Sequence, residues 1–260
     1  MNVVRNRNGL YLSISDEGPA SGRPVVLAHS LGATRAIWDS VAAELVAAGF
    51  RAIRYDLRGH GDSQVPDGPY GVADFGRDLL SVVEELGLER ADIGGLSVGG
   101  MAAMWLAAHE PGRVGRLVLA NTTPYIPAKD RWDPLIAKAL AEGLDDIAEP
   151  MILGWLSAVF KERCPDAASA LVEAMRATPP AGFAGTCAIL RDVDLRGELS
   201  RITAPTLVLH GMEDERGGPA SAALYAGIAG SVRVDIPDAA HLSPAENPRA
   251  VGRAMLEFLA

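Results

Sequence analysis

The stretch Ile93-Gly94-Gly95-Leu96-Ser97-Val98-Gly99-Gly100 decides the fold, because a short apolar run meets a serine between glycines and then continues into an alanine-rich segment. Residues 91–94 have the composition of a buried strand, and residues 101–109 have the spacing of a helix. In a turn this sharp, the positions two before and two after the serine must lack side chains. Gly95 and Gly99 meet this requirement, so the stretch predicts a strand-to-helix turn that exposes the hydroxyl of Ser97. The alternative is an ordinary helix start that Ser97 caps.

Strands and helices alternate on both sides of this turn. The continuous apolar run at residues 25–28 is typical of a central parallel strand, buried on both faces. Further strands are expected at residues 10–15, 50–55, 116–121, 206–209 and 233–236, and helices at 38–48, 70–86 and 248–259. The alternation predicts an α/β fold, with a mostly parallel central sheet and helices on both of its faces.

The alternation stops between residues 123 and 196, where helix-like segments and prolines take over. We interpret this region as a helical lid inserted into a core domain made of residues 1–122 and 197–260. A lid excludes water from a reaction and supplies apolar walls for a substrate. Its tryptophans Trp132 and Trp155 either form the core of the lid or contact the substrate.

Two ionisable side chains follow the last two predicted strands. Asp214 comes after the strand at 206–209, and His241 comes after the strand at 233–236. Ligands bind beyond the carboxyl ends of parallel strands, so both side chains are expected near Ser97. An imidazole can remove the serine proton during attack, and a carboxylate can orient that imidazole. The order of nucleophile, acid and base matches hydrolases that carry this turn. The alternatives for the acid are Glu213, Glu215 and Asp238.

The loop His29-Ser30-Leu31-Gly32 follows the strand at 25–28 and reaches the same edge of the sheet. Its expected role is to donate a backbone N–H to the oxyanion that forms when a serine attacks a carbonyl. The donor is Leu31 or, as the alternative, Ser30. The amide of Val98 is expected to be the second donor. An ordinary turn is the alternative for the whole loop.

Composition excludes several classes of function. The formal net charge is -9 and we find no cluster of Lys and Arg, so no nucleic-acid partner is expected. No stretch approaches the length of a membrane span and the N-terminus lacks a signal pattern, so we expect a cytoplasmic protein without membrane contact. Cys164 and Cys187 match no metal or redox spacing, and we expect both to be reduced and buried. The chemistry predicted above requires no metal and no organic cofactor.

The sequence resembles the 3-oxoadipate enol-lactonases, a family of α/β-hydrolases that open a small carboxylate-bearing lactone in aromatic catabolism. The resemblance runs nearly end to end and is carried by YDLRGHG (55–61), GLSVGGM (95–101), WLAA (105–108), LVLANT (117–122), LRDVDLR (190–196) and AAHLS (239–243). It implies the α/β-hydrolase fold and gives Ser97, Asp214 and His241 the roles argued above.

Two lid positions depart from the pattern of this family. These enzymes typically have one arginine three residues after the first lid tryptophan and another directly before the second, where this chain has Leu135 and Gly154. A buried substrate carboxylate needs a cationic partner, because leaving it unpaired costs several kcal/mol. We therefore predict a preference for a less charged ester or lactone, unless Arg131 or Arg191 supplies the missing charge. The residues expected to bind substrate are Trp132, Leu135, Trp155 and Arg191.

Together these observations predict a serine hydrolase that cleaves a small carboxylic ester or lactone through an acyl-enzyme. The family resemblance makes an enol-lactonase the named candidate. The alternatives are a related carboxylesterase, an amidase or another lactonase. A cofactor-free perhydrolase and a ligand receptor that keeps the three residues are further alternatives, because a fold alone does not fix a function.

Overall fold

The computed structural model describes residues 2–260 except residue 216, and it describes no side chains for residues 217–221. Its centre is one sheet of eight strands in the order β1-β2-β4-β3-β5-β6-β7-β8. Strand β2 pairs antiparallel with β1 and with β4, and the other five strand pairs of the sheet are parallel. The strands are β1 (Asn2–Arg5), β2 (Tyr11–Glu17), β3 (Pro24–Ala28), β4 (Arg51–Tyr55), β5 (Ala91–Leu96), β6 (Val114–Ala120), β7 (Thr206–Gly211) and β8 (Val232–Ile236).

The predicted parallel sheet is confirmed, and each predicted strand is present. Val25 to Ala28 in β3 are completely buried, which explains why the run is continuously apolar rather than alternating. The edge strand β1 was not predicted, because its residues are mostly exposed and carry no apolar pattern. It is held by antiparallel pairing with β2 and by packing against α2, which are long-range contacts that a local sequence pattern does not contain.

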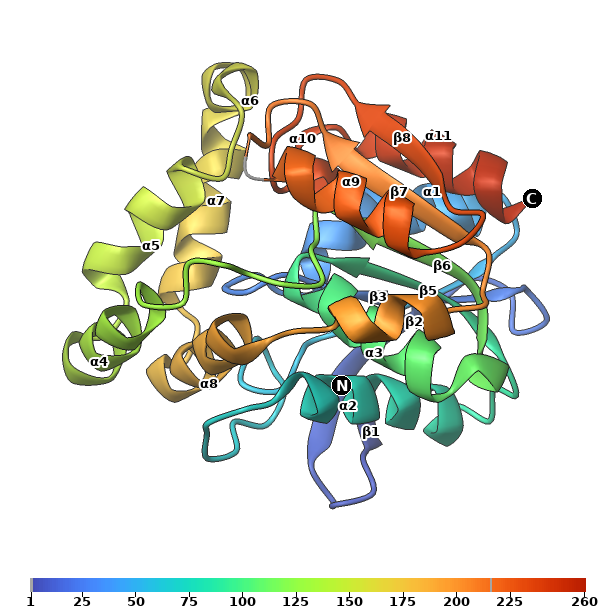
Figure 1. The fold of residues 1–260 in the computed structure, drawn as a ribbon, viewed down its shortest axis with the longest axis horizontal. Helices are drawn as coiled ribbons and strands as arrows, with labels where there is room; N and C mark the ends of the chain where they lie inside the picture. Colours follow the sequence, from blue (N-terminus) through green and yellow to red (C-terminus); the bar gives the residue numbers. More distant parts are fainter. Residues whose placement is uncertain (1, 216) are drawn as a thin grey trace.

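Helices cover both faces of the sheet. Helix α1 packs against α11 on one face, and α2 packs against α3 on the opposite face (Figure 1). Helix α11 begins where the Asn247 side chain accepts the Ala250 N–H and Pro248 occupies the first helical position. The helices that flank the sheet are α1 (Asp39–Ala47), α2 (Val72–Glu85), α3 (Val98–His109), α9 (Gly217–Gly227), α10 (Ser243–Glu246) and α11 (Pro248–Leu259).

Residues 123–196 form a helical insertion between β6 and β7, at one side of the sheet (Figure 1). Helix α4 packs on α8, while α7 packs on both α5 and α6. Its helices are α4 (Trp132–Glu142), α5 (Asp145–Leu153), α6 (Ala158–Arg163), α7 (Pro165–Arg176) and α8 (Pro180–Asp192). That the insertion is a domain of its own, acting as a lid on a core of residues 1–122 and 197–260, stays a prediction.

Two glycines on α8 let the insertion lie directly on the core. A Cβ at Gly182 would collide with the backbone of Gly59, and a Cβ at Gly185 would lie 2.6 Å from the ring of Tyr70. The Gly185 carbonyl also accepts the Tyr70 N–H at 3.3 Å. Because a larger side chain at either position would separate the two layers, the glycines fix how the insertion sits over the sheet.

The prediction for the cysteines was half right. Both are free thiols, but only Cys187 is buried. Burial raises the pKa of the Cys187 thiol well above its usual range. Cys164 is exposed because it lies at the junction between α6 and α7, outside the packed face of either helix. Within the described residues, no helix has the length and apolarity to cross a membrane.

Candidate active site

The predicted strand-to-helix turn is present at Ser97. Strand β5 ends at Leu96, α3 begins at Val98, and Ser97 between them has φ +54°, in the left-handed region that side chains rarely adopt. A Cβ at Gly95 would collide with the backbone of Gly99, and a Cβ at Gly99 would collide with the backbone carbonyls of Ala28 and His29, where β3 ends and its loop begins. The glycines are therefore required by close backbone approach, as predicted from the sequence.

The backbone around Ser97 is fixed on both sides. Its N–H donates to the carbonyl of Ala120 at 3.0 Å, and its own carbonyl accepts the Thr122 hydroxyl at 2.6 Å. Holding a non-glycine residue at such a φ costs on the order of 1–3 kcal/mol, so it persists only where the surroundings impose it. Strained backbone of this kind is concentrated at functional sites.

The structure brings Ser97, His241 and Asp214 together although they are far apart in sequence. His241 Nε2 lies 3.1 Å from Ser97 Oγ, and His241 Nδ1 lies 2.8 Å from Asp214 Oδ2. An ionised carboxylate can only accept, so in this pair Nδ1 carries the ring proton and Nε2 is free to accept the serine proton. The arrangement therefore has the geometry of a nucleophile, a general base and an orienting acid.

The other candidate acids are not placed against the histidine. Glu213, Glu215 and Asp238 are all exposed, whereas Asp214 is buried. Asp238 has φ +53° and occupies the turn between β8 and His241. Of the four candidates, the structure joins Asp214 to the imidazole.

Asn121 is a site residue that sequence reasoning missed. Its Nδ2 donates to Asp214 Oδ2 at 3.1 Å and to the Ala240 carbonyl at 3.0 Å, while its Oδ1 accepts the Ser243 hydroxyl at 2.6 Å. It follows β6 with φ +42°, a conformation that asparagine tolerates better than most residues. The available signal was its place directly after a central strand next to β5. Asn121 thus orients the carboxylate that in turn orients His241.

Two buried histidines hold the loop after β3. The His29 ring donates from Nδ1 to the Ser30 carbonyl at 2.7 Å and accepts the Leu57 N–H at Nε2, 2.9 Å away. The His60 ring donates from Nδ1 to the Arg58 carbonyl and accepts the Gly32 N–H at Nε2, 3.1 Å away. Both rings are therefore neutral. They fix the backbone on either side of Leu31, the residue expected to donate to an oxyanion.

Acid should destabilise the protein through these two rings. Burial lowers the pKa of His29 to about 4 and that of His60 to about 3. Between pH 6.5 and these values the unfolded chain binds protons that the folded chain does not, so stability is lost as pH falls. We expect the free energy of unfolding to drop by about 2 kcal/mol per histidine between pH 7 and pH 5. Urea unfolding at the two pH values measures the drop.

A glutamine at position 60 provides the matched variant, because its side-chain oxygen can accept an N–H but cannot titrate. His60→Gln should remove about half of the drop, again about 2 kcal/mol. The control is His109→Gln, which changes a half-buried histidine outside this loop. An undiminished drop in His60→Gln would show that His60 does not cause the pH dependence.

A cavity of about 840 Å³ opens onto Ser97, His241 and Asp214, which together form the candidate triad. Ser97 and His241 lie in its wall, and the ring of Trp155 lies 5.5 Å from the His241 ring, centroid to centroid. Most of the remaining wall is apolar or aromatic and comes from both the core and the insertion. It includes Met101, Pro124, Tyr125, Ile126, Pro127, Trp132, Gly154, Leu190 and Leu199.

The structure places two of the four predicted substrate-binding residues in this wall. Trp132 and Trp155 line the cavity, but Leu135 and Arg191 do not. Arg191 instead donates to Asp133 and Asp192, each at 2.7 Å, in an ion pair between α4 and α8. The prediction that Leu135 and Arg191 contact substrate is therefore not supported.

Among the described residues of the wall, the charged side chains other than Asp214 all lie where solvent reaches them. Arg131, Arg196, Glu213 and Glu215 are exposed. The Arg131 guanidinium lies 4.4 Å from the centre of the Trp132 ring. The Arg196 guanidinium lies over the ring of Tyr125 and pairs with Asp194 at 2.6 Å. The cavity thus combines an apolar wall with an opening that carries charges of both signs.

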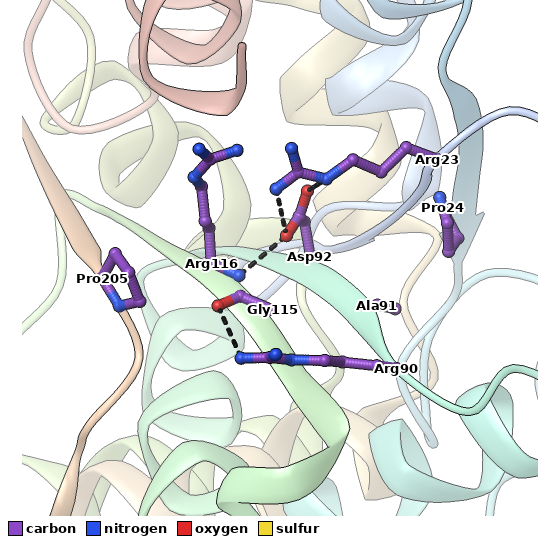
Figure 2. A pocket seen from close by; sticks show the side chains of 8 residues that line it. All are labelled: Arg23, Pro24, Arg90, Ala91, Asp92, Gly115, Arg116 and Pro205. Carbon is purple, nitrogen blue, oxygen red and sulfur yellow. Dashed lines mark hydrogen bonds and ion pairs between the residues drawn. The ribbon is translucent and has the colours of Figure 1, made fainter.

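A second cavity, of about 430 Å³, lies at the opposite, amino-terminal end of the central strands (Figure 2). Arginines 23, 90 and 116 surround it. Arg23 forms an ion pair with the buried Asp92, and both Arg23 and Arg116 donate to the carbonyl of Leu259 at 2.6 Å. Arg23 and Arg116 thus fasten the end of α11 to the amino-terminal ends of the central strands, while Arg90 donates to the carbonyl of Val114 at 2.9 Å.

Comparison with known proteins assigns the class of this chain. A family model described as the alpha/beta hydrolase fold matches residues 23–248, so the chain belongs to the α/β-hydrolase fold family. The chain is 29% identical to 3-oxoadipate enol-lactonase 1 of Acinetobacter baylyi over 246 residues, which are 95% of this chain and 92% of that protein. The predicted resemblance is confirmed.

Solved structures give the same result. The enol-lactonase from Burkholderia xenovorans LB400 matches with a TM-score of 0.95 and 32% identity, covering 99% of both chains. A hydrolase from Pseudomonas aeruginosa PA01 matches with a TM-score of 0.94 and 38% identity, covering 100% of this chain and 98% of that one. The fold predicted from the sequence is therefore confirmed over the whole length of these relatives.

Proposed function

We propose that this protein is a serine hydrolase that cleaves a small carboxylic ester or lactone through an acyl-enzyme. The observation that carries the proposal is the hydrogen-bonded chain from Ser97 through His241 to Asp214 in the wall of a largely apolar cavity. The similarity to enol-lactonases supports this substrate class and makes an enol-lactonase the named candidate. The related carboxylesterases, amidases and other lactonases are the alternatives.

The geometry supports a separate role for each group. His241 Nε2 accepts the Ser97 proton as Oγ attacks the substrate carbonyl, and Asp214 stabilises the imidazolium that forms. The negative oxygen of the tetrahedral intermediate accepts hydrogen bonds from two backbone N–H groups. One belongs to Val98, and the other belongs to Leu31 or, as the alternative, to Ser30. The Val98 amide is suited to this, because the first amides of a helix have no acceptor within the helix.

The second half of the reaction uses the same groups. The imidazolium of His241 returns its proton to the departing alkoxide, which leaves the acyl group on Ser97. When the substrate is a lactone, the alcohol remains tethered to that acyl group. A water molecule that His241 deprotonates then attacks the acyl-enzyme, and the carboxylic acid leaves as Ser97 regains its proton.

A panel of small esters and lactones tests this proposal. Turnover of at least one ester or lactone by the wild-type protein, lost in Ser97→Ala, is the expected result. Hydrolysis that continues at the wild-type rate in Ser97→Ala would refute the acyl-enzyme mechanism. Comparing matched esters, lactones and amides in the same assay then ranks the candidate substrate classes by kcat/KM.

We further expect the buried part of the substrate to be uncharged. Gly154 lies in the cavity wall where related enzymes typically have an arginine, and the cations in the described part of the wall, Arg131 and Arg196, are exposed. A carboxylate deep in the cavity would thus lack a buried cationic partner among the residues that the structure describes, and leaving it unpaired costs several kcal/mol. The kcat/KM for a lactone that bears a free carboxylate should therefore fall below that for its methyl ester.

The exposed arginine beside Trp132 provides the control for this charge preference. The ratio to compare is kcat/KM for the carboxylate-bearing lactone divided by kcat/KM for its methyl ester. Arg131→Gln should leave this ratio nearly unchanged, since the guanidinium lies at the solvent-exposed part of the wall. A ratio far above one that collapses in Arg131→Gln would show that this residue binds a substrate carboxylate. The carboxylate-bearing lactone of the enol-lactonases would then be the better assignment.

A further inference from the structure

The backbone that carries His241 is held by groups outside the sheet. The amides on either side of it, Ala240 and Leu242, both donate to Oε1 of Glu246 at 3.0 Å. The amide of His241 itself donates to the carbonyl of Trp155 at 2.9 Å. Three consecutive N–H groups are thus bound by one half-buried carboxylate and one carbonyl of the helical insertion.

The same carboxylate also reaches the insertion. Oε2 of Glu246 accepts the N–H of Ser157 at 2.7 Å, two residues after Trp155. Ser157 in turn caps α6, because its hydroxyl accepts the Phe160 N–H at 3.1 Å. Glu246 therefore joins both sides of the His241 loop to the start of a helix in the insertion.

An ionised carboxylate fits this position and other side chains do not. Glu246 faces three N–H donors from three separate residues, and an ionised carboxylate is the one common side chain with two oxygens that only accept. Burial raises the pKa of Glu246, while the hydrogen bonds from Ser157, Ala240 and Leu242 act in the opposite direction. Hydrogen bonds to a charged acceptor are about twice as strong as neutral ones.

We propose that Glu246 is a positioning residue for the base, and that it ties the position of His241 to the helical insertion. The proposal rests on the proposed function, because it assumes that His241 accepts the Ser97 proton. That transfer depends on the 3.1 Å separation of Nε2 and Oγ. A displacement of about 1 Å in such a pair can lower a rate about a hundredfold.

Glu246→Gln tests this role, because glutamine offers one acceptor oxygen in place of two. Its NH₂ group must then face the donor from Ser157 or the donors from Ala240 and Leu242. We expect kcat to fall about tenfold to a hundredfold, with KM changed less than about threefold, since Glu246 does not line the cavity. The rates are normalised to the fraction of protein that reacts with an organophosphonate probe.

Two further variants make the result decisive. Glu257→Gln removes the same charge from an exposed site on α11 and should leave kcat unchanged. Glu246→Asp keeps the charge but shortens the side chain by one methylene, so the carboxylate no longer reaches all three N–H groups. This variant should lower kcat at unchanged KM even if Glu246→Gln does not fold. Wild-type kcat in either Glu246 variant would overturn the proposal, as would a loss explained entirely by the unreactive fraction.

Hydrogen exchange separates this proposal from the proposed function. In Glu246→Gln, the amides of Ala240, Leu242 and Ser157 should exchange faster together, whereas the amides of β5 should not change. Unaltered exchange at those three amides would refute the role of Glu246 whether or not Ser97 is the nucleophile. Turnover that persists in Ser97→Ala would instead refute the proposed function, and the exchange result would still stand.

Discussion

Ser97→Ala should lower kcat about a million-fold, which corresponds to about 8 kcal/mol of transition-state stabilisation. The substitution removes the oxygen that lies 3.1 Å from His241 Nε2, so neither the acyl-enzyme nor its proton transfer can form. Alanine is smaller than serine and lies at the same left-handed φ, so the turn itself should remain. Steady-state kinetics on the best ester or lactone of the panel measures the effect.

The control for this variant is Ser40→Ala, which makes the same change at an exposed position on α1. It should keep the wild-type kcat. Comparable losses in both variants would point to damage to the fold rather than to chemistry. A residual rate in Ser97→Ala within tenfold of the wild type would contradict the assignment of the nucleophile.

Asp214→Asn should lower kcat about ten-thousand-fold while the protein remains folded. The Asp214 carboxylate accepts one hydrogen bond from His241 Nδ1 and another from the side-chain amide of Asn121. An asparagine at 214 brings an NH₂ group into this network, so the imidazole is driven toward the tautomer with its proton on Nε2. That tautomer cannot accept the proton of Ser97.

The matched control is Asp238→Asn, which changes an exposed acid in the turn before His241. It should retain nearly full kcat, with circular dichroism and thermal unfolding showing that both variants are folded. If Asp238→Asn loses activity and Asp214→Asn keeps it, the acid has been assigned to the wrong loop.

The parts of the site that could be predicted are those that depend on local backbone geometry. Gly95 and Gly99 are required because the turn at Ser97 brings the backbone into contact with itself and with the loop after β3. That requirement is visible in five consecutive residues. The chain order of Asp214 and His241, each placed after a predicted strand, followed from the alternation of strands and helices.

The parts that could not be predicted depend on which face of an element meets another. Asn121 and Glu246 act through hydrogen bonds to residues far along the chain, and neither lies in a motif with a known mechanism. Arg191 was expected at the substrate, but the orientation of α8 directs it to an ion pair with Asp133. Cys164 was expected to be buried because its region is helical, yet it lies at a helix junction.

The insertion shows the same limit at a larger scale. Its helical character follows from the sequence between residues 123 and 196, but its contacts with the core depend on pairs such as Gly59 with Gly182. Those contacts bring Trp155 beside His241 and Ser157 beside Glu246. The link between the insertion and the base is therefore visible only in the folded protein.

Labelling with an organophosphonate is the sharpest test of Ser97 as the nucleophile, because the probe reacts with a serine activated by a neighbouring base. We expect intact-protein mass spectrometry to show one added label per chain and peptide mapping to place it on Ser97. Turnover should be lost in proportion to labelling. The label should be absent from Ser97→Ala and should form far more slowly in Asp214→Asn. A label on another residue that abolishes turnover, or full turnover by a protein labelled at Ser97, would show that Ser97 is not the nucleophile.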